Sequence, residues 1–219
     1  MTTNAMLEGV EFLDQQPRCA CVLLLDTSGS MHGAAIGALN AGLQTFRDEL
    51  AKDDLAKRRV EVAVVEFNSR VGVVQDFVQA EDFQPPTLAA SGSTSMGAGI
   101  EQAIELVRAR KEKYKANGVT YYRPWIFMIT DGAPTDPVER ATARLREGEE
   151  KKSFTFFSVG VQGADMNRLG HISPRPPKML AGLNFAELFV WLSASMQRVS
   201  QSKAGEMVPM EKPTWDAVQ

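Results

Sequence analysis

Two patterns of apolar residues alternate along the chain: short continuous apolar runs, and segments in which apolar residues recur every three or four positions. Apolar runs of strand length are typical of strands buried on both faces; they are Ala20–Leu25, Val60–Phe67, Trp125–Ile129 and Phe154–Val161. Between them lie helical patterns, in which apolar residues recur every three or four positions. The clearest runs from Ile36 to Leu50, and further ones begin at Ile100 and at Phe185. This alternation predicts an α/β fold with a doubly wound, mostly parallel sheet and helices on both faces.

One strand departs from the parallel arrangement. Val71–Val78 follows the strand Val60–Phe67 after only Asn68-Ser69-Arg70. A connection that short requires the two strands to be antiparallel. The sequence therefore predicts one antiparallel strand at an edge of the sheet. A short last strand is expected at Met179-Leu180, after the break at Pro174–Pro177.

A further helix is predicted to begin near Pro137 and to run to about Lys152. Asp136 stands where an N-cap is expected, and Glu139 stands at the third helical position. Proline at the first helical position and an acidic residue in the first turn are both typical of helix starts. We therefore expect the Asp136 carboxylate to cap this helix.

The chain is expected to form one domain over residues 15–201. An N-terminal extension (1–14) precedes it, and a polar, proline-containing tail (202–219) follows. The tail is either loose or a strap across the surface. Its Trp215 either anchors the tail to the domain or awaits a partner.

Composition narrows the function classes. Hydrophobic residues make up 44% and charged residues 23% of the 219 residues, as in an ordinary globular protein. The net charge is -3 and no long basic run is present, which disfavours nucleic acid and membranes as partners. No apolar run reaches the roughly 18 residues that span a bilayer, and the N-terminus lacks the pattern of a secretory signal. Cys19 and Cys21, the only cysteines, are expected to stay reduced, which fits a cytoplasmic location.

Oxygen-bearing side chains gather where a parallel sheet exposes its carboxyl edge, which is where α/β sheets bind ligands. Asp26-Thr27-Ser28-Gly29-Ser30 follows the first strand, Thr130-Asp131-Gly132 follows the Trp125–Ile129 strand, and Ser91–Gly97 precedes a helix. Carboxylates and hydroxyls suit a hard cation such as Mg²⁺, Mn²⁺ or Ca²⁺ rather than zinc or copper. Two other interpretations of these residues remain open. They could be ordinary turn and helix-cap residues, or they could bind an anion at the start of a helix.

These motifs resemble those of a von Willebrand factor A (VWA) domain: DTSGS after a strand, Thr94 within GSTSMG, and ITDGAPTD after a later strand. In that family they form a metal-ion-dependent adhesion site (MIDAS), and the resemblance covers nearly the whole chain. It implies a Rossmann-like fold with direct metal ligation by the Ser28 and Ser30 hydroxyls. Thr94 would ligate directly in one state and through water in another, and Asp26 and Asp131 would hold metal-bound waters. In this loop Gly92-Ser93-Thr94 (GST) replaces the GGT that is more usual in the family, and the threonine is kept.

The resemblance also implies a function. One open coordination position would take an Asp or Glu side chain of a partner protein, so the domain would be a metal-dependent interaction module. The last helix resembles that of stand-alone bacterial proteins of the tellurium-resistance-associated type. That type implies a cytoplasmic scaffold in stress, tellurite resistance or phage defence, with a kinase-like protein and a PP2C-type phosphatase as partners. The residues expected to form the rim that a partner contacts are Met31, His32, Met96, Ala133 and Pro134.

Two other function classes fit the sequence less well. A nucleotide-binding protein of Rossmann type would carry G-x-G-x-x-G after the first strand, or G-x-x-x-x-G-K-[ST], and neither is found. A Mg²⁺-dependent phosphoryl-transfer or hydrolytic enzyme needs a nucleophile or general base beside the metal. Neither His32 nor His171 lies in such a motif, and Ser28 replaces the companion acid of an aspartyl nucleophile. The sequence thus predicts a binding protein that is not an enzyme, with the enzyme as the alternative.

Overall fold

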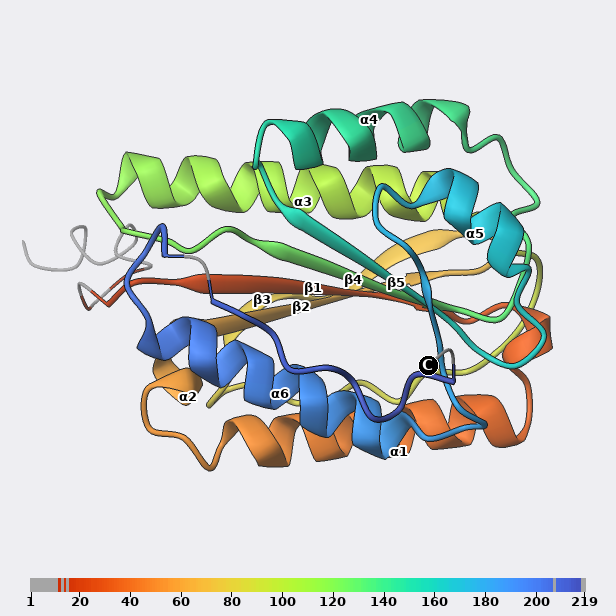
Figure 1. Cartoon of the computed structure of the whole chain (residues 1–219), viewed down its shortest axis with the longest axis horizontal. Coiled ribbons are helices and arrows are strands. Elements are labelled where there is room, and N and C mark those ends of the chain that lie inside the picture. The colour runs from red at the N-terminus through yellow and green to blue at the C-terminus, as the bar shows by residue number, and fades with distance from the viewer. Residues whose placement is uncertain (1–11, 13, 15, 207, 218–219) are drawn as a thin grey trace, which may run out of the picture.

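The computed structural model describes residues 12, 14, 16–206 and 208–217 and places a sheet between two layers of helices (Figure 1). The sheet has six strands in the order β3-β2-β1-β4-β5-β6. The strands are β1 (Cys19–Asp26), β2 (Val60–Phe67), β3 (Val71–Gln79), β4 (Trp125–Thr130), β5 (Thr155–Gly160) and β6 (Lys178–Met179). The helices are the 3-10 turn η1 (Gly29–Met31), α1 (Ala34–Leu50), α2 (Ala56–Arg59), α3 (Met96–Ala116), α4 (Glu139–Glu150), α5 (Met166–Ile172) and α6 (Phe185–Gln201).

The central strand of the sheet is β1. It pairs in parallel with β2 on one side and with β4 on the other, and all eight of its residues are buried. Its side chains alternate between faces, so Leu23 and Leu25 enter one hydrophobic core while Val22 and Leu24 enter the other. Burial on both faces explains why this strand is a continuous apolar run.

The helices cover both faces of the sheet. Figure 1 shows α1 and α6 against one face and α3, α4 and α5 against the other. At the edge, β3 pairs antiparallel with β2, so the predicted sheet, mostly parallel with one antiparallel edge strand, is confirmed. Among the described helices, none is long and apolar enough to cross a bilayer.

Both cysteines lie inside the protein. Cys19 and Cys21 are free thiols on β1, each fully buried in the core that α1 and α6 cover. Burial raises the pKa of the Cys19 thiol to about 12 and raises that of Cys21 further still. The expected reduced pair is therefore what the structure contains.

Two helices differ from the prediction. Helix α4 begins at Glu139, and its N-cap residue Val138 makes no side-chain cap, so the predicted start near Pro137 is two residues early. Helix α5 was not predicted, because its seven residues are too short to show a helical period. Its N-cap is Asp165, and it carries His171 in its last turn.

Residues 208–217, here called the strap, lie against the domain. Asp216 forms an antiparallel bridge with Leu180, and the Ala181 amide donates to the carbonyl of Trp215 (2.9 Å). The Trp215 side chain is 1% exposed and packs edge-on against Trp191 of α6, with ring centroids 5.4 Å apart. Of the two alternatives for the described part of the tail, the structure shows the strap, with Trp215 as its anchor.

Helix α1 packs closely against α6 at Gly42. A Cβ at Gly42 would lie 2.6 Å from Phe189 Cδ2 and 2.9 Å from Phe185 Cβ, closer than packing allows. Gly42→Ala is therefore expected to lower the free energy of unfolding by about 1–3 kcal/mol, because overpacking outweighs the gain in helix propensity.

Gly37, on the same helix, is the matched control. A Cβ there meets nothing within 4 Å. Gly37→Ala should raise the free energy of unfolding by about 0.5–1 kcal/mol. Urea unfolding of both variants measures the difference, and stabilisation by Gly42→Ala would contradict the described contact between the two helices.

Candidate metal centre

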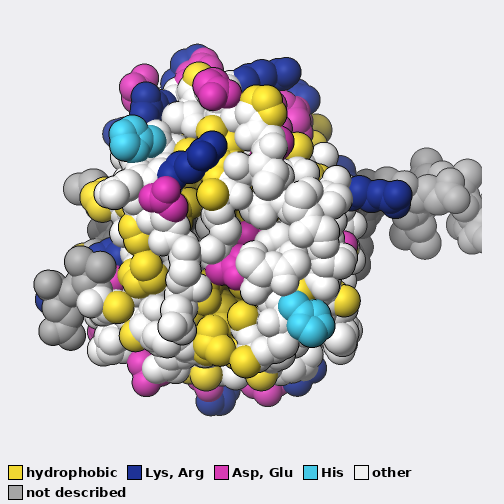
Figure 2. Space-filling model, turned by 90° about the vertical axis from the view of Figure 1, so that its right-hand side faces the viewer, with side chains coloured by type: hydrophobic (Ala, Val, Ile, Leu, Met, Phe, Trp, Pro, Cys, Tyr) yellow, Lys and Arg dark blue, Asp and Glu magenta, His cyan; other side chains and the backbone are white. Residues whose placement is uncertain are grey.

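The edge of the sheet where β1 and β4 end carries the predicted site. Figure 2 faces this edge and shows acidic side chains in the centre, with hydrophobic side chains around them. Loop 27–33 leaves β1, loop 131–138 leaves β4, and loop 89–95 leads into α3. Because β1 and β4 are parallel neighbours, their loops begin side by side.

Asp26 is the innermost acidic residue of the site. Its carboxylate is fully buried, accepting from the Ser28 amide at Oδ1 (2.8 Å) and from the Thr130 hydroxyl at Oδ2. Burial raises the pKa of the Asp26 carboxyl, the hydrogen bonds from Ser28 and Thr130 oppose the rise, and the negative charge of Asp131 adds to it. The charged form of Asp26 is therefore costly here unless a cation lies nearby.

Two serines connect the β1 loop to the β4 loop. Ser28 Oγ lies 3.0 Å from Ser30 Oγ, and the Ser30 hydroxyl donates to Asp131 Oδ1 (2.7 Å). Ser28 is 1% exposed, whereas Ser30 is exposed and Asp131 is half-buried. The three side chains thus form a chain of oxygen atoms that leads from the protein interior to the surface.

Thr94 joins this group from the third loop, and Gly132 shows how close it lies. A Cβ built on Gly132 would be 3.2 Å from Thr94 Oγ1 and 3.7 Å from Asp26 Oδ2. Glycine at position 132 therefore leaves open a space that is bordered by oxygen atoms of Thr94 and Asp26. The five residues proposed from the sequence, Asp26, Ser28, Ser30, Thr94 and Asp131, are brought together at one place.

Two residues of the β4 loop, Thr135 and Asp136, join it to the Thr94 loop and to the start of α3, and the sequence analysis assigned neither of them to the site. The Thr94 amide donates to Thr135 Oγ1 (3.1 Å), and the Thr135 amide donates to the Thr94 carbonyl (2.9 Å). The Asp136 carboxylate accepts from the amides of Gly97 (3.0 Å) and Ala98 (2.8 Å) at the start of α3. Asp136 is thus a helix cap, as predicted, but it caps α3 instead of α4.

The β2–β3 turn holds the same loop from the other side. The Asn68 side-chain amide donates to Thr27 Oγ1 (3.1 Å), and the backbone carbonyl of Asn68 accepts from the Ser95 amide (2.8 Å). Ser69 Oγ accepts from the Ser93 amide (2.9 Å). Ser93 is the residue at which GST departs from GGT. Its amide and its hydroxyl both contact Ser69, so this residue helps to hold the loop against the β2–β3 turn.

The donor chemistry fits a hard divalent cation. Two carboxylates and three hydroxyls meet here, all of them oxygen donors of the kind that Mg²⁺, Mn²⁺ and Ca²⁺ take. Within the described part of the chain, no group of three or more His, Cys, Asp or Glu side chains could hold a metal. A site of the type that zinc prefers is therefore not formed by those residues.

Neither histidine belongs to this arrangement. His32 is exposed after η1, and His171 Nδ1 lies 2.7 Å from the Asn167 carbonyl within α5. In Figure 2 the histidine side chains on this face lie away from the acidic centre. The described side chains that bind Asp26 and Asp131 are hydroxyls, not imidazoles.

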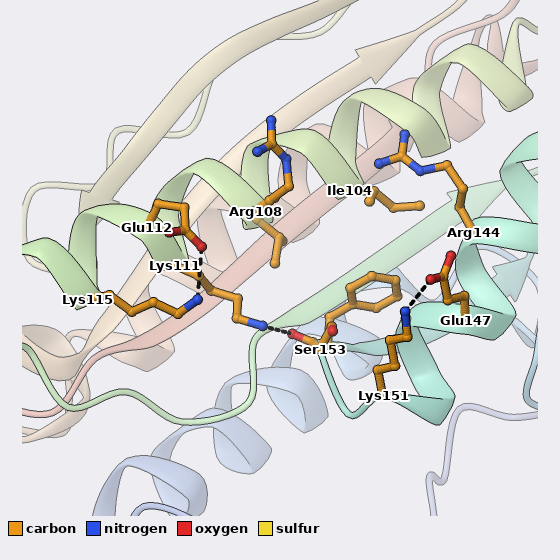
Figure 3. A pocket seen from close by; sticks show the side chains of 12 residues that line it. Ile104, Arg108, Lys111, Glu112, Lys115, Arg144, Glu147, Lys151 and Ser153 are labelled. Atoms are coloured by element: carbon orange, nitrogen blue, oxygen red, sulfur yellow. Dashed lines mark hydrogen bonds and ion pairs between the residues drawn. The ribbon is translucent and has the colours of Figure 1, made fainter.

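A cavity of about 360 Å³ lies elsewhere, between α3 and α4, and is lined by none of the five site residues (Figure 3). Its Lys115 pairs with Glu112 (2.9 Å) and its Lys151 with Glu147. The Lys111 ammonium donates to the Ser153 carbonyl (3.0 Å), and burial lowers its pKa. These charges are largely satisfied within the cavity wall.

An α/β domain with hydroxyls and carboxylates converging at its carboxyl edge has the architecture of a ligand-binding domain. The chain belongs to the von Willebrand factor type A domain family, whose family model matches residues 21–188. That family consists of protein-interaction modules.

Known relatives cover most of this chain. Collagen alpha-6(VI) chain of Homo sapiens is 26% identical over an alignment of 177 residues, and the match covers 75% of this chain and 7% of that protein. Matrilin-3 of Mus musculus is 25% identical over an alignment of 160 residues, and the match covers 71% of this chain and 32% of that protein. The chain therefore spans less than a third of the length of each.

Solved structures share the fold. A von Willebrand factor type A protein from Catenulispora acidiphila has a TM-score of 0.63 at 20% identity, covering 83% of this chain and 43% of that one. The pilus adhesin SpaC from Lactobacillus rhamnosus GG, in an open conformation, has a TM-score of 0.66 at 15% identity, covering 84% and 30% respectively. At these identities the likeness shows the fold alone.

The contact between Asp136 and α3 gives a prediction for the loops. Asp136→Ala removes a carboxylate that accepts from two amides, and is expected to lower the free energy of unfolding by about 1 kcal/mol. In a chain of this size that lowers the melting temperature by about 2–4 °C. Because the same carboxylate joins the β4 loop to the start of α3, two residues after Thr94, a Mg²⁺ ion bound at this site should also stabilise this variant less than it stabilises the unaltered protein.

Asp165→Ala is the matched control, since Asp165 caps α5 by accepting from the Arg168 amide (2.9 Å). Asp165→Ala should lower the free energy of unfolding by a similar amount, and Mg²⁺ should stabilise this variant as much as it stabilises the unaltered protein. Equal responses in the two variants would show that Asp136 does not position the loop.

Proposed function

We propose that this chain is a metal-ion-dependent protein-interaction module that binds a carboxylate of its partner through Mg²⁺ or Mn²⁺, with Ca²⁺ as a third candidate. The observation that carries the proposal is the meeting of five oxygen-bearing residues from three loops at one edge of the sheet. They are Asp26, Ser28, Ser30, Thr94 and Asp131.

The roles of these residues follow from their chemistry. The hydroxyls of Ser28, Ser30 and Thr94 would ligate the ion, and Asp26 and Asp131 would hold its water ligands. Neutral hydroxyls leave much of the ion's positive charge uncompensated, so the bound ion would attract an anionic oxygen from outside. A partner's Asp or Glu side chain supplies such an oxygen.

The rim of the site is smaller than the sequence indicates. Met31 and Met96 are fully buried and Pro134 is buried, so the prediction that they contact a partner is wrong. Met31 packs into the core that α1 and α6 cover, and Met96 packs into the core on the other face of the sheet. His32 and Ala133 are exposed, as predicted, and remain the rim residues available to a partner.

We propose that the site serves binding and not turnover. Supporting this, the hydrogen-bond partners of the Asp26 and Asp131 side chains among the described residues are hydroxyls and an amide. A hydrolytic or phosphoryl-transfer reaction would need a general base at hydrogen-bond distance from the attacking group.

The sequence resemblance extends the proposal to a cellular role. We propose a cytoplasmic bacterial scaffold in a stress, tellurite-resistance or phage-defence system, with a kinase-like protein and a PP2C-type phosphatase as partners. Its net charge of -3 supports protein rather than nucleic acid as the partner class. Recovering proteins that co-purify with Mg²⁺ but not with EDTA tests this role and identifies the partner.

Metal binding is expected to raise the melting temperature. A ligand that binds only the folded state stabilises it by about 2.7 kcal/mol at a hundredfold excess over Kd. For a chain of this size the rise is about 5–10 °C. Asp26→Asn keeps an acceptor at this position but removes the negative charge, and should abolish the rise in a thermal melt with Mg²⁺ or Mn²⁺.

Asp54→Asn makes the same charge change at an exposed position beside α2 and should leave the rise intact. Equal rises in the two variants would contradict the site. If Mg²⁺ and Mn²⁺ do not raise the melting temperature of the unaltered protein either, the proposal that it binds a metal is contradicted.

A partner that reaches the metal with one carboxylate should depend strongly on Thr94. Thr94→Ala is expected to cost at least about 2 kcal/mol of binding free energy, or about 30-fold in Kd. Thr45→Ala, at a half-buried threonine of α1, is the control and should leave Kd unchanged. Isothermal titration in Mg²⁺ measures both.

A double-mutant cycle then tests whether the contact is direct. Replacing the partner's critical acid by alanine should weaken binding about as much as Thr94→Ala does, and the two losses should not add, because they remove one interaction. Additive losses, or undiminished binding in EDTA, would place the contact elsewhere.

A further inference from the structure

The cavity between α3 and α4 is lined by more positive than negative charge (Figure 3). Its cationic lining residues are Arg108, Lys111, Lys115, Arg144 and Lys151, and its acidic ones are Glu112 and Glu147. The chain as a whole has a net charge of -3, so positive charge is concentrated here against the overall composition. The cavity volume of about 360 Å³ lies in the range of sites that hold small molecules.

Three of these cations lie on one face of α3. Arg108, Lys111 and Lys115 are spaced by three and by four residues along this helix. Side chains at these spacings are neighbours on a helix surface, and like charges there destabilise the helix. An anion bound between them would remove this repulsion.

Lys111 is the exception among the paired charges of the cavity. Its ammonium donates to the neutral Ser153 carbonyl (3.0 Å), and it forms no ion pair with a carboxylate of the described residues. Burial lowers the pKa of Lys111; the positive charges of Lys115 and Arg123 add to this effect, and the charge of Glu112 opposes it. A lysine ammonium has three N–H donors, so Lys111 can still donate to an anion.

The other two lysines are held by weak pairs. Lys115 pairs with Glu112 (2.9 Å) and Lys151 with Glu147, each within one helix, and all four side chains are more than half exposed. Exposed pairs of this kind contribute little to stability. In Figure 3, Lys111 extends toward Ser153 with Lys115 on one side of it and Lys151 on the other. Both flanking lysines can therefore turn from their glutamates to a ligand at Lys111.

We propose that this cavity binds a small organic phosphate, with the phosphoryl group at Lys111 and between Lys115 and Lys151. A phosphate monoester carries a charge of about -1.5 to -2 at neutral pH and three acceptor oxygens. It thus compensates the excess positive charge better than a monovalent carboxylate does. The organic part would lie along the groove, against the aliphatic stems of the lysine and arginine side chains.

This site is independent of the proposed metal function. The cavity is lined by none of Asp26, Ser28, Ser30, Thr94 and Asp131. Binding is to be measured in EDTA, so that a phosphate cannot be held through a metal ion at the other site. Failure of one proposal therefore leaves the other unaffected.

Phenyl phosphate is the probe, and benzoate is its monovalent counterpart with the same ring. A ligand-observed NMR titration of the full chain should give saturable binding of phenyl phosphate that weakens as ionic strength rises. Benzoate should bind at least about 5-fold more weakly because it carries less charge. Absence of saturable binding at millimolar phenyl phosphate, or equal affinity for benzoate, would overturn the proposal.

Lys111→Gln tests the central contact. It keeps a side-chain N–H for the Ser153 carbonyl but removes the charge, and should weaken phenyl phosphate binding about 10-fold, the equivalent of one hydrogen bond to a charged group. Lys113→Gln is the matched control, because Lys113 is an exposed lysine of α3 that does not line the cavity. It should change Kd by less than about 2-fold, since solvent and salt screen a charge outside the site. Equal weakening by both variants would show a general charge effect and no site.

Glu147→Gln should act in the opposite direction. It removes the carboxylate that pairs with Lys151, so this ammonium becomes available to the phosphoryl group. Phenyl phosphate binding should tighten by about 2- to 5-fold, the worth of an exposed ion pair. Unchanged or weaker binding by this variant would contradict the part assigned to Lys151.

Discussion

The parallel pairing of β1 with β2 and β4 is the constraint on which the site depends. Three neighbouring strands end at one edge, so the loops after β1 and β4 and the β2–β3 turn start within reach of one another. Burial of β1 on both faces fixes its register, because a shift of one residue would exchange the side chains of the two cores. The position of Asp26 at the strand's end is therefore set by the hydrophobic cores beneath it.

The loops add rigidity where the strands end. The Asp26 carboxylate accepts from Ser28 of the β1 loop and from Thr130 at the end of β4. Thr135 joins the β4 loop to Thr94, and Asp136 joins it to the start of α3. Glycine is required at this junction, because a Cβ on Gly97 would lie 2.2 Å from the Pro137 carbonyl. A site preorganised in this way loses little conformational entropy when a ligand binds, and affinity benefits accordingly.

Much of the fold could be predicted from the sequence because its strands are continuous apolar runs and its long helices keep one apolar face. That Asp26 and Asp131 lie at the same edge could be predicted, because each follows a strand of a sheet expected to be mostly parallel; that their strands are neighbours is known only from the structure. The role of Asp136 could not be predicted, since a residue next to Pro137 carries the local signal of one helix start while its carboxylate reaches another. Met31 and Met96 were misplaced because position in a motif says nothing about which way a side chain points.

The buried thiols of β1 have a practical consequence. Only a thiolate reacts readily with alkylating reagents, and burial holds both Cys19 and Cys21 in the protonated form at neutral pH. In the folded state the protein thus behaves toward such reagents as if it had no cysteine. A single thiol introduced by Ala133→Cys, at an exposed position beside the metal loops, would carry a spectroscopic label selectively, with the native cysteines left in place.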